Sequence, residues 1–159
     1  MRHRRIARHA GFTLVELVVV IVILGIVAAF AVPRFFDNNT FMTRGYYEEL
    51  AAALKYAQKL AVASGCPVRV TVAAGSYVAR QQAVLAASCD PADASFPTAV
   101  ALADGQTLAG TAPSGVTAVP AVTLTFDALG RTNLAGDQAI AVGPFTMSVR
   151  AGSGFVEAP

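Results

Sequence analysis

An apolar segment behind a basic start constrains this chain more than any other feature of its sequence. Residues 12–32 read FTLVELVVVIVILGIVAAFAV, in which only Thr13 and Glu16 interrupt an apolar or glycine run. As a helix this segment would be about 31 Å long, close to the ~30 Å hydrocarbon core of a bilayer. The residues before it contain four arginines and no acid. This charge predicts a cytoplasmic start, with the rest of the chain on the far side of the membrane.

The composition fits an apolar segment joined to a folded domain. Hydrophobic residues make up 55% of the 159 residues and charged residues 14%, against roughly 45–50% and about 25% in soluble domains. Disorder of the whole chain is therefore excluded. The formal net charge of +2 is too small to indicate a nucleic-acid-binding protein. Two cysteines exclude a multi-cysteine zinc site and a dense disulfide scaffold.

Glu16 separates three interpretations of the apolar segment. A plain membrane anchor leaves this carboxylate without a role, and so does a secretory signal peptide cut at the small-x-small sequence 29–31. A carboxylate inside a membrane helix costs ~2.5–3.5 kcal/mol, which marks a function. Cleavage between Gly11 and Phe12 would create an α-ammonium four residues before Glu16, on the same helix face. Glu16 would then pair with its own terminus or with that of a neighbouring helix, where it would set an axial stagger.

The string Gly11-Phe12-Thr13-Leu14-Val15-Glu16-Leu17, between a basic leader and a long Val/Ile/Leu run, resembles the cleavage and methylation motif of type IV prepilins and pseudopilins. The resemblance implies that a prepilin peptidase cuts after Gly11 and N-methylates Phe12. It implies that Glu16 contacts the Phe12 amine during assembly. The helix would hold the subunit in inner-membrane lipid until a membrane platform adds it to other pilins in a filament.

Cleavage after Gly11 would divide the chain and change its chemistry. Lys plus Arg falls from 12 to 8 while Asp plus Glu stays at 10, so the mature formal charge is −2. Both histidines, His3 and His9, lie in the leader, so imidazole catalysis and His-based metal sites are excluded in the mature chain. The expected segments are a leader peptide (1–11), a transmembrane and assembly helix (12–33), an amphipathic continuation of the helix (34–65) and a periplasmic β domain (66–159).

A second helical pattern follows Pro33, which kinks or ends the first helix because it lacks an N–H. Within 34–45, several residues are expected to weaken a helix, namely Asp37, Asn38, Asn39 and Gly45. Either Asp37 or Thr43 is a candidate cap. From Tyr46 onward apolar residues recur at helical spacing, namely Tyr47, Leu50, Leu54, Ala57 and Ala61. Gly65 and Pro67 end this helix, whose apolar stripe is expected to pack on the sheet that follows.

Alternating residues predict strands in the rest of the chain. Residues 68–80 form a hairpin pattern with a turn at 73–76, and residues 86–121 read as irregular connection with one short strand near 100–102. Further strands are expected at 122–126, 140–142, 145–150 and 155–156. The predicted fold class is α+β, type IV pilin-like, with a long N-terminal helix packed on a mostly antiparallel β domain.

Cys66 and Cys89 flank this hairpin, so its folding brings them together. In an oxidising periplasm they are expected to form a disulfide, which closes a loop worth ~3 kcal/mol in the chain-entropy model. The alternative of a reactive or metal-binding pair lacks a third ligand and a basic neighbour.

The later part of the chain is similar to the minor pseudopilin GspH and the minor pilin FimT. Residues 56–61 resemble the helix ending of that group, 125–131 its Phe-x-x-x-Gly-Arg turn, and 145–154 its C-terminal hairpin. Residues 44–47 are also similar to the minor prepilins called MshC, of the mannose-sensitive haemagglutinin (MSHA) type. The leading interpretation is a structural minor pilin or pseudopilin, of a pilus or of a type II secretion pseudopilus.

Two other classes of function are disfavoured by the sequence. A FimT-like DNA-binding pilin is disfavoured because residues from 34 onward carry 8 Lys and Arg against 9 Asp and Glu. The turn 152–155 holds no basic residue, and Arg131 and Arg150 alone could form a patch. An enzyme is disfavoured because no mature His, free Cys or paired carboxylate nominates a catalytic residue, a cofactor or a metal.

Overall fold

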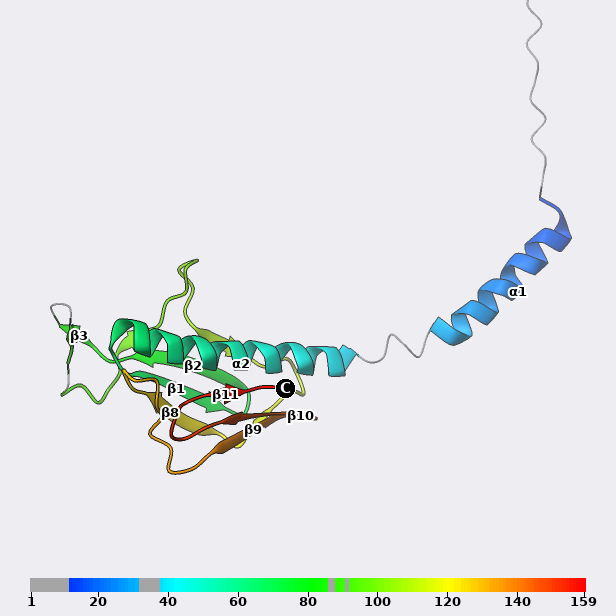
Figure 1. The fold of residues 1–159 in the computed structure, drawn as a ribbon. Coiled ribbons are helices and arrows are strands. Elements are labelled where there is room, and N and C mark those ends of the chain that lie inside the picture. Colours follow the sequence, from blue (N-terminus) through cyan, green and yellow to red (C-terminus); the bar gives the residue numbers. More distant parts are fainter. Residues whose placement is uncertain (1–11, 32–37, 86–87, 91) are drawn as a thin grey trace, which may run out of the picture. The chain divides into compact units, whose positions relative to one another are not determined.

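The computed structural model describes residues 12–31, 38–85, 88–90 and 92–159. The chain divides into two units, Met1–Asn38 and Asn39–Pro159 (Figure 1). The first unit contains the helix α1 (Leu14–Ala31), and the second contains the helix α2 (Asn38–Ser64) with all the described strands. The expectations for Gly11, Pro33 and Asp37 fall outside the described residues.

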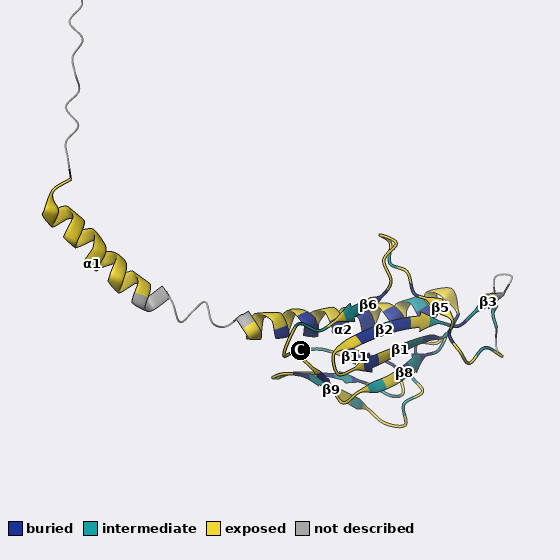
Figure 2. Ribbon diagram, turned by 180° about the vertical axis from the view of Figure 1, so that it is seen from behind, coloured by how far each residue is buried: buried dark blue, intermediate teal, exposed yellow. Residues whose placement is uncertain are grey.

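The helix α1 begins with a side-chain cap. Thr13 Oγ1 accepts a hydrogen bond from the Glu16 N–H at 3.2 Å, and the Thr13 carbonyl accepts one from the Leu17 N–H at 3.2 Å. Thr13 is therefore the N-cap residue. The large apolar side chains between Leu14 and Val27 are 42–78% exposed (Figure 2, yellow). Judged on the described residues alone, no helix combines the length and apolarity needed to cross a membrane.

The helix α2 begins at Asn38, which agrees with the earlier of the two starts that the sequence left open. Its 27 residues include Asn38, Asn39 and Gly45, which were expected to weaken a helix. Thr43 is not a cap but lies inside the helix, where its Oγ1 donates to the Asn39 carbonyl at 2.6 Å. The residue Thr43 is buried. Burial of the next turn, with Tyr46 and Tyr47 at 1–2% exposure, stabilises this first segment, so packing outweighs local propensity.

The strands form two main sheets in which all the described pairs are antiparallel. The strands are β1 (Val68–Ala73), β2 (Ser76–Gln81), β3 (Val84–Leu85), β4 (Ser88–Cys89), β5 (Thr98–Ala99), β6 (Ala109–Thr111), β7 (Ala118–Val119), β8 (Val122–Phe126), β9 (Gln138–Val142), β10 (Phe145–Val149) and β11 (Val156–Glu157). One sheet has the order β5-β2-β1-β8, with β6 also paired to β2, and the other has the order β11-β10-β9-β7. A small hairpin joins β3 to β4.

This arrangement confirms the α+β class and most of the expected strands. The hairpin of β1 and β2 has its turn at 74–75, and β8, β9 and β10 follow the predicted alternation. The short strand expected near 100–102 lies instead at Thr98–Ala99, where it pairs with the end of β2. The strands β3, β4, β6 and β7 were not predicted, because segments of two or three residues show no alternation.

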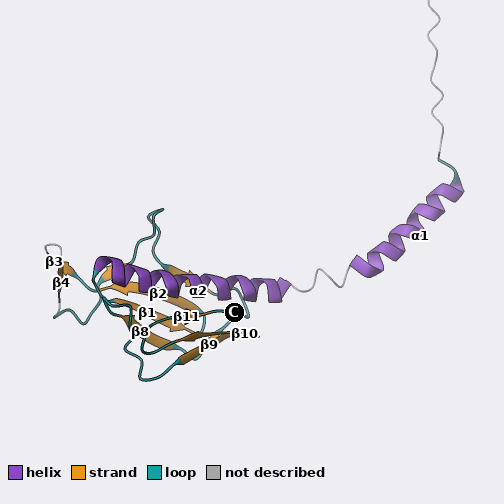
Figure 3. Cartoon of the chain, in the orientation of Figure 1, coloured by secondary structure: helices purple, strands orange, loops and turns teal. Residues whose placement is uncertain are grey.

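The hydrophobic core lies between α2 and the sheets (Figure 3). The predicted stripe of α2 forms its helical side, with Leu50, Leu54 and Ala57 fully buried. Tyr47 is also buried, and its hydroxyl donates to the Thr146 carbonyl in β10 at 3.2 Å. The inward residues of the sheets complete the core, including Val68, Val70, Leu124, Phe126, Ile140, Val142, Met147 and Val149.

Replacement of Gly45 by alanine should stabilise the protein. Gly45 lies inside α2, is exposed, and an added Cβ would meet no atom within 4 Å. Alanine in a helix interior is favoured over glycine by about 0.5–1 kcal/mol, so the melting temperature should rise. As a control, Gly154→Ala should lower it, because Gly154 has φ +65° and a Cβ there would collide with the Gly130 carbonyl oxygen. An unchanged or lower melting temperature for Gly45→Ala would contradict the expectation.

Candidate functional site

Phe12 lies just before α1, four residues ahead of Glu16, which is in the first turn of the helix. Phe12 is 78% exposed and directly precedes the Thr13 cap. Within the described part of the chain, the Glu16 carboxylate makes no hydrogen bond or ion pair. Both this acid and the apolar surface of α1 therefore lack a partner among the residues of their unit that the structure describes. A helix that is apolar on all sides needs an apolar environment around it.

A second set of contacts joins α2 to β2. The Tyr77 hydroxyl donates to Glu49 Oε1 at 2.6 Å, and the Tyr77 ring lies 6.2 Å from the ring of Tyr46. Burial raises the pKa of Tyr77, and the bond to Glu49 raises it further, so the phenol remains a donor. Gly110 in β6 permits this packing, because a Cβ there would collide with Glu49 and with the Tyr77 ring. The sequence pattern did not single out these residues, which come from three separate segments.

The turn that resembles Phe-x-x-x-Gly-Arg is tied to α2 by one side chain. Gln58 Nε2 donates to the carbonyls of Gly130 and Ser153, each at 3.0 Å, so it holds this turn and the C-terminal glycine turn together. Gly130 has φ +77°, a conformation that favours glycine. The Asp127 carboxylate accepts from the Arg131 backbone N–H at 2.8 Å and from its guanidinium at 2.9 Å.

The two arginines considered for phosphate binding are both paired with acids. Arg131 forms an ion pair with Asp127 at 2.9 Å. Arg150 forms two, with Asp137 and with Glu157, both at 2.7 Å. The hydrogen bond from Arg150 lowers the pKa of Asp137, and the bond to Asp137 raises the pKa of Arg150. This patch therefore offers little uncompensated positive charge to a phosphate backbone.

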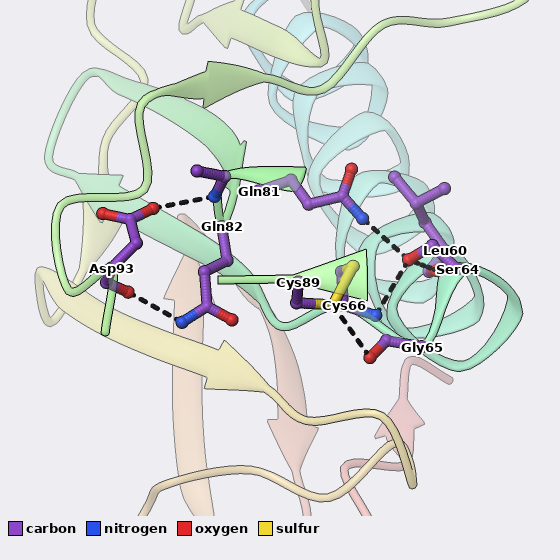
Figure 4. The surroundings of a disulfide bond; sticks show 9 residues. Leu60, Ser64, Gly65, Cys66, Gln81, Gln82, Cys89 and Asp93 are labelled. Carbon is purple, nitrogen blue, oxygen red and sulfur yellow. Dashed lines mark hydrogen bonds between the residues drawn. A yellow bond between two sulfur atoms is a disulfide. The ribbon is translucent and has the colours of Figure 1, made fainter. Parts of the chain in front are cut away.

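Cys66 and Cys89 form a disulfide, with their Cα atoms 5.3 Å apart (Figure 4). Cys66 is buried just after α2, and Cys89 belongs to the hairpin of β3 and β4. Ser64 reinforces this junction: its hydroxyl donates to the Leu60 carbonyl at 2.7 Å and accepts from Gln81 Nε2 at 2.7 Å. The expected disulfide thus anchors the β3–β4 segment to the end of α2.

The segment beyond this hairpin is held by hydrogen bonds to Asp93. Its Oδ2 accepts from the Ala83 N–H at 2.7 Å, and Gln82 Nε2 donates to the Asp93 carbonyl at 2.7 Å (Figure 4). Bonds from Ser95 and Ala83 lower the pKa of Asp93. In the described residues no group of three or more His, Cys, Asp or Glu is arranged to hold a metal.

Comparison with known proteins identifies the class of subunit that this architecture defines. Residues 6–32 match the prokaryotic N-terminal methylation motif, and residues 47–156 match the family described as type II transport protein GspH. Together with a capped apolar helix and an α+β domain, these matches define a type IV pilin or pseudopilin subunit. The second match spans more than half of the chain, and the chain belongs to the GspH family, whose members are structural subunits.

Two individual proteins are similar to this chain. The type IV narrow pilus major component PilA5 of Thermus thermophilus is 45% identical over 62 residues, which is 38% of this chain and 53% of that protein. The chain thus matches about half the length of this relative. A crystal structure of the type IV minor pilin FimU of Pseudomonas aeruginosa PAO1 has a TM-score of 0.49 and 19% identity, covering 73% of this chain and 91% of that chain.

Replacement of Asp137 by asparagine should reduce the loss of stability, measured as melting temperature, that occurs when the pH is lowered. Asp137 loses its bonds to Arg150 when it is protonated, and its pKa lies below the ordinary value of 3.8. Its contribution is thus present above pH 3.8 and is lost as the pH falls through the lower pKa of the folded state. Asp137→Asn should melt below the wild type at pH 7, and the difference should shrink below pH 3.8.

Thermal melts followed by circular dichroism across this pH range would measure the effect. Asp104→Asn is the matched control, because Asp104 makes no ion pair among the described residues and asparagine keeps the oxygen that accepts from the Gln106 N–H. A difference between Asp137→Asn and wild type that stays constant down to low pH would contradict the assignment.

Proposed function

We propose that this protein is a minor pilin or pseudopilin subunit of a type IV filament system, either a type IV or MSHA-like pilus or a type II secretion pseudopilus. Prepilin peptidase cleaves it between Gly11 and Phe12 and N-methylates Phe12. The mature subunit crosses the inner membrane once, with its N-terminus cytoplasmic and its C-terminal domain periplasmic. An inner-membrane platform then adds it to other pilins through α1.

The exposed apolar surface of α1 is the observation that carries this proposal. Its side chains are not covered by any residue of their unit that the structure describes, and full burial of one such side chain contributes about 1.5–3 kcal/mol relative to water. In lipid the gain is smaller, since the acyl chains are equally apolar, and helix association depends on close van der Waals packing. Gly25 has open space around its Cα, which leaves room for a second helix to approach.

The free carboxylate of Glu16 supplies the specificity that an apolar helix lacks. Among the described residues the Glu16 carboxylate forms no hydrogen bond or ion pair, so it is available for the α-ammonium of Phe12 after cleavage. An ion pair in a medium of low polarity is costly to break by removing one partner. Pairing between neighbouring helices would therefore select one axial stagger among many apolar packings of similar energy.

Replacement of Glu16 should block assembly without blocking maturation. Glu16→Ala and the isosteric Glu16→Gln should be processed and retained in the membrane, yet be absent from sheared filaments, because the ammonium of Phe12 loses its partner. Immunoblots of membrane and filament fractions would measure this distribution. Glu48→Ala, which removes an exposed acid of α2, is the control and should assemble. If Glu16→Gln assembles like the wild type, the register role of Glu16 is wrong.

Replacement of Gly11 should block maturation itself. Gly11→Ala places a methyl group at the residue before the proposed scissile bond, so the precursor should accumulate with its leader attached. Intact-mass measurement distinguishes this precursor from the methylated form that begins at Phe12. An N-terminus at Phe12 in the variant, or cleavage near residue 31 in the wild type, would refute the cleavage assignment.

A further inference from the structure

The first turns of α2 expose two large apolar side chains. Phe41 is 80% exposed and Met42 is 40% exposed, and the start of α2 is yellow in Figure 2. The next residue, Thr43, is buried against the domain. Phe41 lies two residues before Thr43, which places it about 160° away around the helix. Its ring therefore lies on the face of α2 opposite the core.

The apolar character of this face ends after the first turns of the helix. Arg44 and Glu48 follow as an exposed ion pair at 2.7 Å, about 5 Å and about 10 Å from Phe41 along the helix axis. The later positions on the face of Phe41 are exposed and carry small or charged residues, namely Gly45, Glu48, Ala52, Lys55 and Lys59.

This distribution selects the kind of partner that the first turns of α2 can meet. A helix of another protein packed lengthwise would need apolar residues at successive turns of the face, and the positions beyond Met42 do not supply them. A lipid–water interface is apolar to a depth of about 5–10 Å and polar beyond it. An aromatic side chain followed within about two turns by an ion pair matches that profile.

The turn between β9 and β10 extends the same uncharged end of the domain. A Cβ at Gly143 would collide with the Thr43 side chain, so this turn lies against the start of α2. Gly143 and Pro144 are exposed and uncharged, and Phe145 is half-buried. The Arg44 guanidinium lies 5.1 Å from the centre of the Phe145 ring. An arginine packed on a ring in this way can keep its charge in water while its stem covers apolar surface.

The chain itself keeps the start of α2 close to the proposed membrane helix. Residues 32–37 alone separate α1 from α2, and a chain of this length extends by at most about 25 Å. Where α1 crosses the membrane, the first turn of α2 is therefore confined to the region next to the bilayer surface. Lipid is then the apolar phase nearest to Phe41.

We propose that Phe41, Met42 and the turn 143–144 form a membrane-contact edge, which enters the lipid–water interface of the inner membrane before assembly. The Phe41 ring reaches the boundary between headgroups and acyl chains, and the Arg44–Glu48 pair stays among headgroups and water. This inference rests on the proposed function, because α1 brings the domain to the bilayer. A second point of attachment would restrict the orientation in which the platform receives the subunit.

Fluorescence quenching at different depths tests this contact, because the chain contains no tryptophan. Phe41→Trp in the full mature chain, reconstituted into vesicles of phosphatidylethanolamine and phosphatidylglycerol, should give blue-shifted emission. Lipids brominated near the headgroup end of their acyl chains should cause the largest loss of this emission. Lipids brominated near the end of the acyl chains should cause a smaller loss.

Two further single-tryptophan variants are the controls. Ile23→Trp lies in the middle of the apolar segment and should be quenched most by the deep bromines. Leu129 is 71% exposed, similar to Phe41, but its turn is held by Gln58, about 25 Å farther along α2. Leu129→Trp should therefore keep its emission in both lipids. Melting temperatures close to the wild type would show that the variants are folded.

Photo-cross-linking in cells distinguishes lipid from a protein partner. Phe41 is replaced by p-benzoyl-phenylalanine in cells without the inner-membrane platform, so that the subunit stays in the membrane. Irradiation should give an adduct with the mass of a phospholipid, and the same replacement at Leu129 should give none. An adduct of position 41 with another pilin or membrane protein would overturn the assignment.

The quenching results separate this inference from the proposed function. If Ile23→Trp is quenched and Phe41→Trp is not, the membrane-contact edge is refuted while the membrane anchor stands. Equal quenching of Phe41→Trp and Leu129→Trp would also refute the edge, because the domain would then adsorb without a preferred side. If Ile23→Trp is not quenched, the proposed membrane crossing fails, and the membrane-contact edge fails with it.

Discussion

The burial of one stripe of α2 against both sheets is the interaction on which the folded domain depends. Leu50, Leu54 and Ala57 are fully buried there. Other contacts of the domain are made by side chains on the flanks of α2 and by the residues at its end. Gln58 holds two turns, Glu49 receives the Tyr77 hydroxyl, and the residues after Ser64 lead into the disulfide. A helix with one buried face can organise three such sites because its other side chains are free to reach outward.

The helix α1 differs from α2 because its described apolar side chains are exposed. Its apolar side chains point to every side of the helix, and none of the described residues of its unit covers them. Such a surface is stable only in lipid or among other apolar helices. In the described part of the chain, the Glu16 carboxylate near the start of α1 makes no hydrogen bond or ion pair, whereas Glu49 of α2 accepts the Tyr77 hydroxyl. The arginines of the β domain that were considered for phosphate binding are committed to internal ion pairs.

The structure gives a physical reason for the Phe-x-x-x-Gly-Arg pattern of the turn at 126–131. Phe126 is fully buried in the core, and Gly130 adopts a left-handed conformation directly beneath α2. Arg131 then closes the turn on Asp127. A Cβ at Gly154 would collide with the Gly130 carbonyl oxygen, so the two turns can pack this closely only with glycine at 154, while the φ of +77° favours glycine at 130. The motif thus preserves a close approach of two backbones under Gln58.

The sequence alone determined the features whose physical cause is local. The apolar run with Glu16, the helical stripe from Tyr47 and the alternation in β1, β2, β8 and β10 all depend on residues within a few positions of one another. The pattern left two starts open for α2, and the structure has the earlier one, because burial of Tyr46 and Tyr47 outweighs the weak helix propensity of the preceding residues. Only the tertiary structure decided the short strands β5 to β7 and the contact of Glu49, Tyr77 and Gly110. These depend on partners many residues apart, and no local pattern records which distant segments will meet.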